Sequence, residues 1–287
     1  MIQTFKEEYN MVVQHNITAM NSNRQLGVTT GAQSKVTEKL SSGYKINRAA
    51  DDAAGLTISE KMRSQIRGLT QASSNAQDGV SCVQTAEGAL TEVHSMLQRM
   101  NELAVKSANG TNTSADRAAI QSEVSALTDE ISRVSQSTQF NTLNLLNGDF
   151  SGDDAKKLQV GAANKAEQTI TISIQSMSAG SLGVSQTQMS VGSQTAAQAA
   201  IEAINAAISQ VSAQRSDLGA IQNRLEHTIA NLDNIVENTT AAESAIRDTD
   251  MAKTMVEFTK NNILSQAGTS MLAQANQSTQ SVLSLLG

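Results

Sequence analysis

The sequence predicts a mainly α-helical protein, in which long antiparallel helices form a coiled-coil or bundle rod with a small β-hairpin-containing segment mid-chain. The 287 residues include no proline, the residue that interrupts helix interiors. Apolar residues recur at spacings of three and four over long stretches, which is the period of coiled-coil packing. Two Tyr, four Phe and no Trp favour thin helix–helix seams over a thick core, because large rings normally supply much of a core's buried area.

The strongest helical pattern runs from Met62 to Ala104. Its stripe consists of Met62, Ile66, Leu69, Ser73, Ala76, Val80, Val83, Glu87, Leu90, Val93, Leu97, Met100 and Ala104. We expect a single helix of about fifty residues here. Asn109–Asn112 interrupts the pattern, and Ser114 with Asp116 is expected to cap the next helix, because side-chain oxygens satisfy free N–H groups at a helix start.

A second long helix is predicted in the last third of the chain. Ile204, Val211, Leu218, Leu225 and Leu232 recur every seven residues, and sustained heptads predict coiled-coil packing. The single cysteine, Cys82, lies on the first apolar stripe. It is expected to be a small core residue.

The segment from about 140 to 190 differs from the rest. Thr169–Ile174 alternates β-branched residues with period two, which predicts a strand, and Leu158–Val160 is its candidate partner. The order is therefore helices, a small β insertion, then helices. The first and last helices can lie antiparallel and pair.

Both chain ends are almost free of charge. No charged residue occurs from Asn261 to Gly287, where 14 of 27 positions are Asn, Gln, Ser or Thr, and Arg24 is the single fixed charge between Met11 and Gln33. Solvated helix surfaces normally carry Lys and Glu. We therefore predict that the ends are buried in an assembly. The predicted assembly seam comprises Leu264, Met271, Val282, Leu285 and Leu286, with Ile17 and Met20 at the other end. A disordered tail in the isolated monomer is the alternative, and it is compatible with burial because a segment can fold when it binds.

Composition and motifs argue against several classes of function. A net charge of −6 disfavours nucleic-acid binding, which needs a basic patch. His15, His94 and His227 form no metal-binding pair, and neither a Walker-type loop nor GxGxxG is present. We expect no enzymatic activity, no metal and no cofactor.

The ends also fit neither a membrane span nor a secretory signal. The polar content of the charge-free C-terminal stretch disfavours a transmembrane helix. The opening MIQTFKEEYN carries charges where a signal peptide has its apolar region. A secreted protein of this sequence is expected to leave the cell by another route.

Several longer stretches resemble bacterial flagellin, the subunit of the flagellar filament. The matching stretches are Met11–Ile17, Leu40–Leu56, Asp78–Gly79, Thr85–Leu90, Leu97–Val105, Gln139–Gly148 and Ser281–Gly287. The resemblance covers nearly all of the chain from Met11 onward. It implies a secreted, non-enzymatic structural protein that polymerises into an extracellular filament serving motility, with export through the flagellar type III apparatus.

The resemblance also implies a domain organisation. Residues 11–52 with 243–287 would form a terminal coiled-coil domain that lines an inner tube. Residues 53–242 would form a helical rod domain carrying the β segment at about 140–190. Residues 1–10 are then an N-terminal extension.

The partners implied by the resemblance are copies of the chain itself, an export chaperone on residues 251–286, and the filament cap and hook-junction proteins. A further implied partner is the host innate immune receptor TLR5, whose motif matches Arg99, Leu103 and Glu123. The same helices would face neighbouring subunits, so a structural role for these three residues has equal weight. The nearest alternative function is a flagellin-like hook–filament junction protein, and a coiled-coil adaptor is a more distant one.

Overall fold

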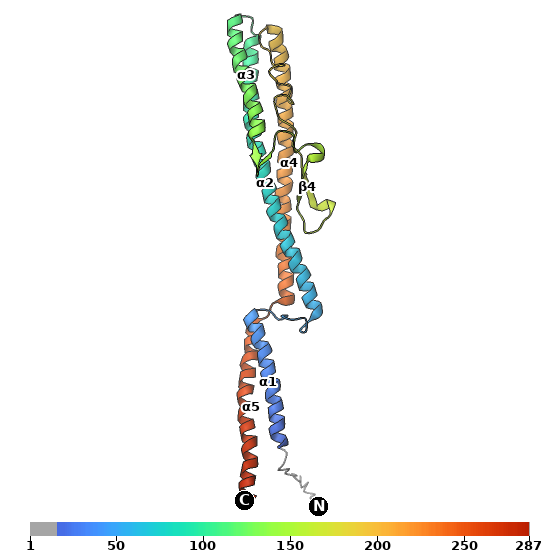
Figure 1. Cartoon of the computed structure of the whole chain (residues 1–287), viewed down its shortest axis with the longest axis vertical. Coiled ribbons are helices and arrows are strands. Elements are labelled where there is room, and N and C mark those ends of the chain that lie inside the picture. The colour runs from blue at the N-terminus through green and yellow to red at the C-terminus, as the bar shows by residue number, and fades with distance from the viewer. Residues whose placement is uncertain (1–15, 287) are drawn as a thin grey trace, which may run out of the picture. The chain divides into compact units, whose positions relative to one another are not determined.

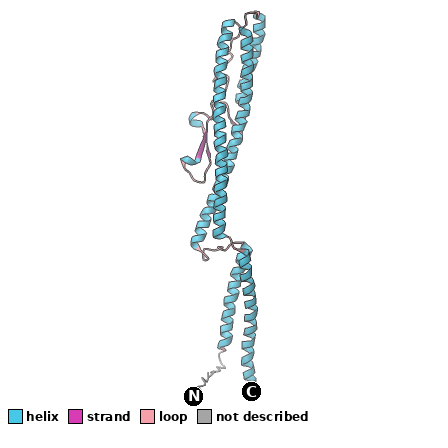
Figure 2. Cartoon of the chain, turned by 180° about the vertical axis from the view of Figure 1, so that it is seen from behind, coloured by secondary structure: helices cyan, strands magenta, loops and turns pink. Residues whose placement is uncertain are grey.

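The computed structural model describes residues 16–286, except for the side chains of Asp153 and of residues 279–286. Five helices account for most of these residues: α1 (Ile17–Ser42), α2 (Ala53–Ala108), α3 (Ser114–Ser137), α4 (Gln194–Arg247) and α5 (Met251–Leu286). Two small antiparallel hairpins lie between α3 and α4. The predicted fold class is confirmed (Figures 1 and 2).

The chain forms two compact units. The central unit spans Ser64–Thr239, and the terminal unit comprises the chain up to Arg63 and from Thr240 onward. Residues 1–15 lie outside the described part of the chain. They include the N-terminal extension 1–10 that the resemblance implies.

The central unit is built on the seam between α2 and α4, which lie side by side with α3 (Figure 1). All five heptad residues predicted on α4 are buried: Ile204, Val211, Leu218 and Leu225 have no exposed surface, and Leu232 is 5% exposed. Leu225 packs with Ala76, and Leu232 packs with Leu69 and Ala72 of α2. The predicted long helix over Met62–Ala104 is confirmed as part of α2, and Cys82 is buried on the seam as expected. Burial raises the pKa of its thiol.

Helix α3 begins one residue earlier than predicted. Its N-cap is Thr113, whose hydroxyl accepts a hydrogen bond from Asp116 N at 3.3 Å, while the Asp116 carboxylate accepts one from Thr113 N at 2.9 Å. This reciprocal arrangement is a capping box. Asp116 therefore has the predicted capping role, but Ser114 is the first helical residue and not the cap. The hydrogen bonds from Thr113 lower the pKa of Asp116.

The predicted strand pair is confirmed. Strand β3 (Lys156–Gln159) pairs antiparallel with β4 (Thr169–Ile172), and Leu158 lies opposite Ile170. A second hairpin, β1 (Gln139–Phe140) with β2 (Leu143–Asn144), was not predicted. Strands of two residues are too short to show a period-two pattern. Two short 3-10 helices, η1 (Gly152–Asp154) and η2 (Ala166–Gln168), complete this segment.

Glutamine side chains hold the irregular segment before α4 against the helices. Gln121 of α3 donates to Met189 O at 2.8 Å and accepts from Val191 N at 2.7 Å. Gln214 of α4 accepts from Gln175 N at 3.1 Å and donates to Ser173 O at 3.2 Å. Met189 and Val191 are buried, so their backbone groups need partners inside the protein. The amide of glutamine, with one donor end and one acceptor end, supplies the hydrogen bonds that a neighbouring strand would otherwise provide.

In the terminal unit, α1 and α5 pair antiparallel, as predicted. Asn16 Nδ2 donates to Ala275 O at 2.8 Å, and Leu26 lies against Gly268. The partly or fully buried residues of the two helices include the apolar side chains Leu26, Val36, Phe258 and Leu272 beside small or polar residues such as Ser22, Thr254, Ser265 and Gly268. Small residues let two helix backbones approach closely.

We predict that Gly68→Ala destabilises the central unit, whereas Gly88→Ala stabilises it. A Cβ at Gly68 would lie 2.8 Å from Ala162 Cβ and 3.3 Å from its Cα, in the loop between β3 and β4, whereas a Cβ at Gly88 meets nothing within 4 Å. Both substitutions gain about 1 kcal/mol of helix propensity, but displacing backbone at Gly68 costs about 1–3 kcal/mol. Urea unfolding followed by circular dichroism measures both. Equal stabilisation by the two variants would show that the hairpin does not press on α2.

Candidate assembly surfaces

The two connectors of the terminal unit form a short antiparallel ladder. Gly43 ends α1 with φ +76°, a left-handed conformation that favours glycine. Tyr44 then bridges Asp248, with hydrogen bonds from Lys45 N to Arg247 O at 2.8 Å and from Thr249 N to Gly43 O at 2.9 Å. The chain leaves α1 and enters α5 at the same place. This ladder therefore sets the register of the α1–α5 pair.

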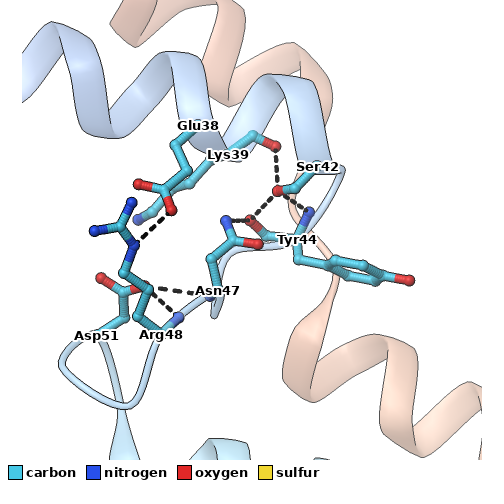
Figure 3. Close-up of polar contacts among 7 residues, drawn as sticks. All are labelled: Glu38, Lys39, Ser42, Tyr44, Asn47, Arg48 and Asp51. Carbon is cyan, nitrogen blue, oxygen red and sulfur yellow. Dashed lines mark hydrogen bonds and ion pairs between the residues drawn. The ribbon is translucent and has the colours of Figure 1, made fainter.

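The connector from α1 to α2 is held by its own polar side chains (Figure 3). The Asp51 carboxylate accepts hydrogen bonds from Arg48 N at 3.0 Å and Asn47 N at 3.2 Å, which lower the pKa of Asp51. Arg48 Nε donates to Glu38 at 2.9 Å, and Ser42 accepts from the Tyr44 backbone at 3.1 Å. These bonds hold the connector against the C-terminal end of α1.

The start of α2 is fixed by packing as well as by a cap. Asp52 Oδ1 accepts from Gly55 N at 2.9 Å, the N-capping arrangement that satisfies a free donor. Ile46 is 4% exposed beside it. A Cβ at Gly55 would lie 2.8 Å from Ile46 Cδ1 and 2.4 Å from Asp52 Oδ2. A larger residue at this position would therefore have to displace the Asp52 carboxylate or the Ile46 side chain.

Arg247 is the main polar link between the ends of α2 and α4. Its guanidinium donates to Glu60 at 2.6 Å and to Ser59 Oγ at 3.3 Å, and it stacks over the Tyr44 ring at 4.9 Å. Ser59, fully buried, in turn donates to Glu243 at 2.8 Å. The side chain of Arg247 is only 11% exposed, so it connects both helices to the connector from a protected position. We name Arg247, Tyr44, Ser59, Glu60 and Glu243 the arginine node.

The terminal helices leave large apolar side chains in solvent. Among the predicted seam residues, Ile17, Met20, Leu264 and Met271 are 61%, 65%, 47% and 61% exposed. Val28, Met251, Met255, Val256 and Ile263 are likewise exposed. Along the same stripe of α5, Gly268 lies against Leu26 of α1 and the Ala275 carbonyl accepts from Asn16, whereas Leu264 and Met271 remain exposed. The side chains of the predicted residues Val282, Leu285 and Leu286 lie outside the described ones.

Hydroxyl groups on the same helices bond to their own backbone. Thr29, Ser34 and Thr37 of α1 each donate to the carbonyl four residues earlier, at 2.9–3.0 Å. Thr259 and Ser270 of α5 do the same. These side chains are exposed, yet their donors are already satisfied within the helix.

The three residues matched to the receptor motif lie together along α2 and α3. Arg99 Nη2 is 2.9 Å from Glu123 Oε1, and Arg99 Nη1 is 3.0 Å from Glu102 Oε2. Hydrogen bonds to Glu102 and Glu123 raise the pKa of Arg99. Leu103 is 3% exposed and lines the floor of a shallow groove that Arg99 and Glu123 border. A partner on this face would meet the two charged residues first.

The described part of the chain holds neither a cluster of metal ligands nor a membrane-spanning helix. Within residues 16–286, no group of three or more His, Cys, Asp or Glu side chains could hold a metal ion. No helix in that range is both long and apolar enough to cross a membrane.

Comparison with known proteins identifies the family of this chain. The model of the bacterial flagellin N-terminal helical region matches residues 13–151, and that of the C-terminal helical region matches residues 201–286. This chain belongs to the bacterial flagellin family. It is a structural protein, a subunit of the bacterial flagellar filament, and the filament is extracellular.

Relatives within the flagellin family match the chain almost from end to end. The flagellin of Halalkalibacterium halodurans is 54% identical over 276 residues, covering 96% of this chain and 100% of the relative. The flagellar filament 31.3 kDa core protein of Treponema maltophilum is 52% identical, and so is the flagellin of Bacillus subtilis, each with the same coverage.

A solved structure shares the fold. The chain superposes with a TM-score of 0.59 on a protein described as flagellar hook-associated from Vibrio parahaemolyticus, at 15% identity, covering 69% of this chain and 100% of the other. At that identity the likeness shows the fold alone. Bacillus cereus flagellin is 28% identical with a TM-score of 0.48, covering 55% of this chain and 88% of that chain.

We predict that Arg247→Ala loosens both connectors, whereas Arg48→Ala does not. Losing the guanidinium removes the bonds to Glu60 and Ser59 from a protected site, at a cost of about 2 kcal/mol. Arg48 is 72% exposed, and an ion pair of this kind contributes less than about 1 kcal/mol. Hydrogen exchange at the Lys45 and Thr249 amides should accelerate in the Arg247 variant alone. If exchange at both amides is unchanged in that variant, the backbone ladder alone sets the register of the α1–α5 pair.

Proposed function

We propose that the exposed apolar face of α1 and α5 is the surface through which this flagellin-family subunit polymerises. The observation that carries the proposal is the exposure of Ile17, Met20, Leu264 and Met271 on two helices in which, among the described residues, Val36 is the only buried apolar side chain. Monomeric proteins rarely leave contiguous apolar surface in solvent, and larger exposed patches mark interaction sites. The absence of charge from Asn261 to Gly287 supports the same assignment.

The driving force for polymerisation is burial of these side chains between subunits. Fully burying one Leu, Ile or Met contributes about 1.5–3 kcal/mol. The opposing term is the loss of translational and rotational freedom with side-chain ordering. Because the face carries no Lys, Arg, Asp or Glu over residues 261–287, no charge in that stretch has to be desolvated without a partner. Apolar contacts therefore decide the balance.

The contact is heterologous, since it joins different faces of identical subunits. A repeated heterologous contact that does not close into a ring generates a helical filament. We propose that residues 11–52 with 243–287 line the inner tube of that filament and that 53–242 form the surrounding rod layer.

The same face requires a partner before assembly. An exposed apolar surface of this kind is an aggregation liability in the cell. We propose that an export chaperone covers residues 251–286 until the chain passes through the flagellar type III apparatus. The filament cap and the hook-junction proteins are the partners proposed for the same face at the two ends of the filament.

A second proposed interaction concerns TLR5. Arg99 and Glu123, both about half exposed, would supply charge-assisted hydrogen bonds to the receptor, and Leu103, which is 3% exposed, would support these two side chains from below. The Arg99–Glu123 ion pair at 2.9 Å also links α2 to α3, so both residues have a structural role as well. Receptor binding is distinguished from that role if reversing both charges keeps the fold and abolishes receptor activation.

We predict that replacing Leu264 and Met271 together by Ser blocks polymerisation without unfolding the monomer. Both side chains are exposed in the monomer, so the helix content should be unchanged. Losing two buried side chains from each subunit contact should raise the critical concentration for seeded growth about a hundredfold or more. Light scattering and electron microscopy of protein seeded with filament fragments measure this effect.

The matched control for this pair is Gln274→Ser, which shortens an exposed polar side chain on the same helix. It should polymerise as the unmodified chain does. Normal filament growth by the Leu264/Met271 variant would sink the proposal that this face carries assembly.

A further inference from the structure

The chain contains two Asn-Gly dipeptides in the same local turn. Asn109 Oδ1 accepts from Thr111 N at 3.3 Å, and Asn147 Oδ1 accepts from Asp149 N at 3.0 Å. In each case the side chain bonds the backbone two residues on, which is an Asx turn. This turn places the amide carbon of the side chain close to the backbone nitrogen of the following glycine and polarises its carbonyl.

That geometry prepares a known reaction of asparagine amides. The glycine nitrogen gives up its proton to water and bonds to Asn Cγ, the Cγ–Nδ2 bond breaks, and the amide takes a proton and leaves as ammonia. One water molecule then opens the succinimide ring at either carbonyl, giving aspartate or isoaspartate. Glycine favours the attack because it has no Cβ to block it and rotates freely. The rate therefore depends on how freely the backbone of each dipeptide can turn.

The surroundings of Asn109 restrain the turn less than those of Asn147 do. Asn109 and Gly110 are both exposed, just beyond the end of α2 at Ala108. A Cβ at Gly110 would meet no atom within 4 Å. Its own local bonds are long, at 3.3 Å from Asn109 N to Lys106 O and 3.4 Å from Asn112 N to Asn109 O.

The surroundings of Asn147 restrain the same turn. Its flanking residues Leu146 and Phe150 are buried, and their carbonyls accept from Met177 N at 2.9 Å and Ile174 N at 3.0 Å. Asn147 Nδ2, the leaving amide, donates to the Asp149 carboxylate at 2.6 Å. Gly148 is held at φ +106° with its carbonyl bonded by Ser151. Attack on Asn147 would require several of these bonds to break first.

We propose that Asn109 is a site of spontaneous deamidation in the folded protein and that Asn147 is protected from it. The product is a carboxylate at the end of α2, and the isoaspartate form adds one carbon to the backbone there. Arg117 Nη2 donates to Asn109 O at 3.1 Å and Arg117 Nε to Ser107 O at 3.1 Å. The modification therefore alters both the charge and the path of the connector that Arg117 holds between α2 and α3.

The test is to age the purified full chain in mildly alkaline buffer and map isoaspartate by enzymatic methyl labelling and peptide mass spectrometry. Isoaspartate should accumulate at position 109 roughly tenfold or more faster than at 147, since each retained hydrogen bond at the second site slows the reaction by up to about that factor. Gly110→Ala should slow the reaction at 109 and leave 147 unchanged. That variant is expected to fold, because the added Cβ enters open space.

A synthetic peptide of residues 106–113 gives the reference rate for an unrestrained Asn109. Conversion of the peptide without conversion of Asn109 in the protein would overturn the proposal. Equal or faster conversion at 147 would overturn it as well, because the protection assigned to the Asn147 segment would then be absent.

Discussion

The seam between α2 and α4 is the contact on which the central unit depends. Its heptad positions are filled by single aliphatic side chains that leave almost nothing exposed, from Leu232 at one end to Ile204 further along. Helix α3 packs against this pair of helices. The segment before α4 is then bonded by Gln121 of α3 and Gln214 of α4. The hairpin of β3 and β4 can then rest on Gly68. A coiled-coil seam can thus organise a unit with few aromatic residues.

The terminal unit is built by the opposite means. Among the described residues of its two helices, Val36 is the only buried apolar side chain, so hydrophobic burial alone is a weak source of register. The register comes from the ladder between the connectors and from the arginine node beside it. The exposed apolar side chains of α1 and α5 are the surface that we propose for polymerisation.

Periodic features could be predicted from the sequence, and features that depend on partners distant along the chain could not. The heptads at Ile204–Leu232 and the alternation at Thr169–Ile174 are repeated local signals, and both predictions are confirmed. On the stripe through Leu264 and Gly268, Gly268 lies against Leu26 of α1 while Leu264 stays exposed, and spacings of three and four define a wide stripe without telling which of its residues contact α1. The backbone-binding role of Gln121 and the node around Arg247 had no local signal. Both roles arise only after residues far apart in sequence are brought together.

The hydroxyls that bond their own helix have a consequence for how copies of the terminal helices can pack. Thr37 and Thr259 present methyl groups and satisfied donors, so removing water from them breaks few hydrogen bonds and creates no demand for a particular acceptor across an interface. The free energy of a contact through such a surface depends on the area buried and does not favour one particular offset along the helix axis. Neighbouring copies could slide by a fraction of a helical turn at little cost in free energy, so one sequence could support more than one stable arrangement of the same contact.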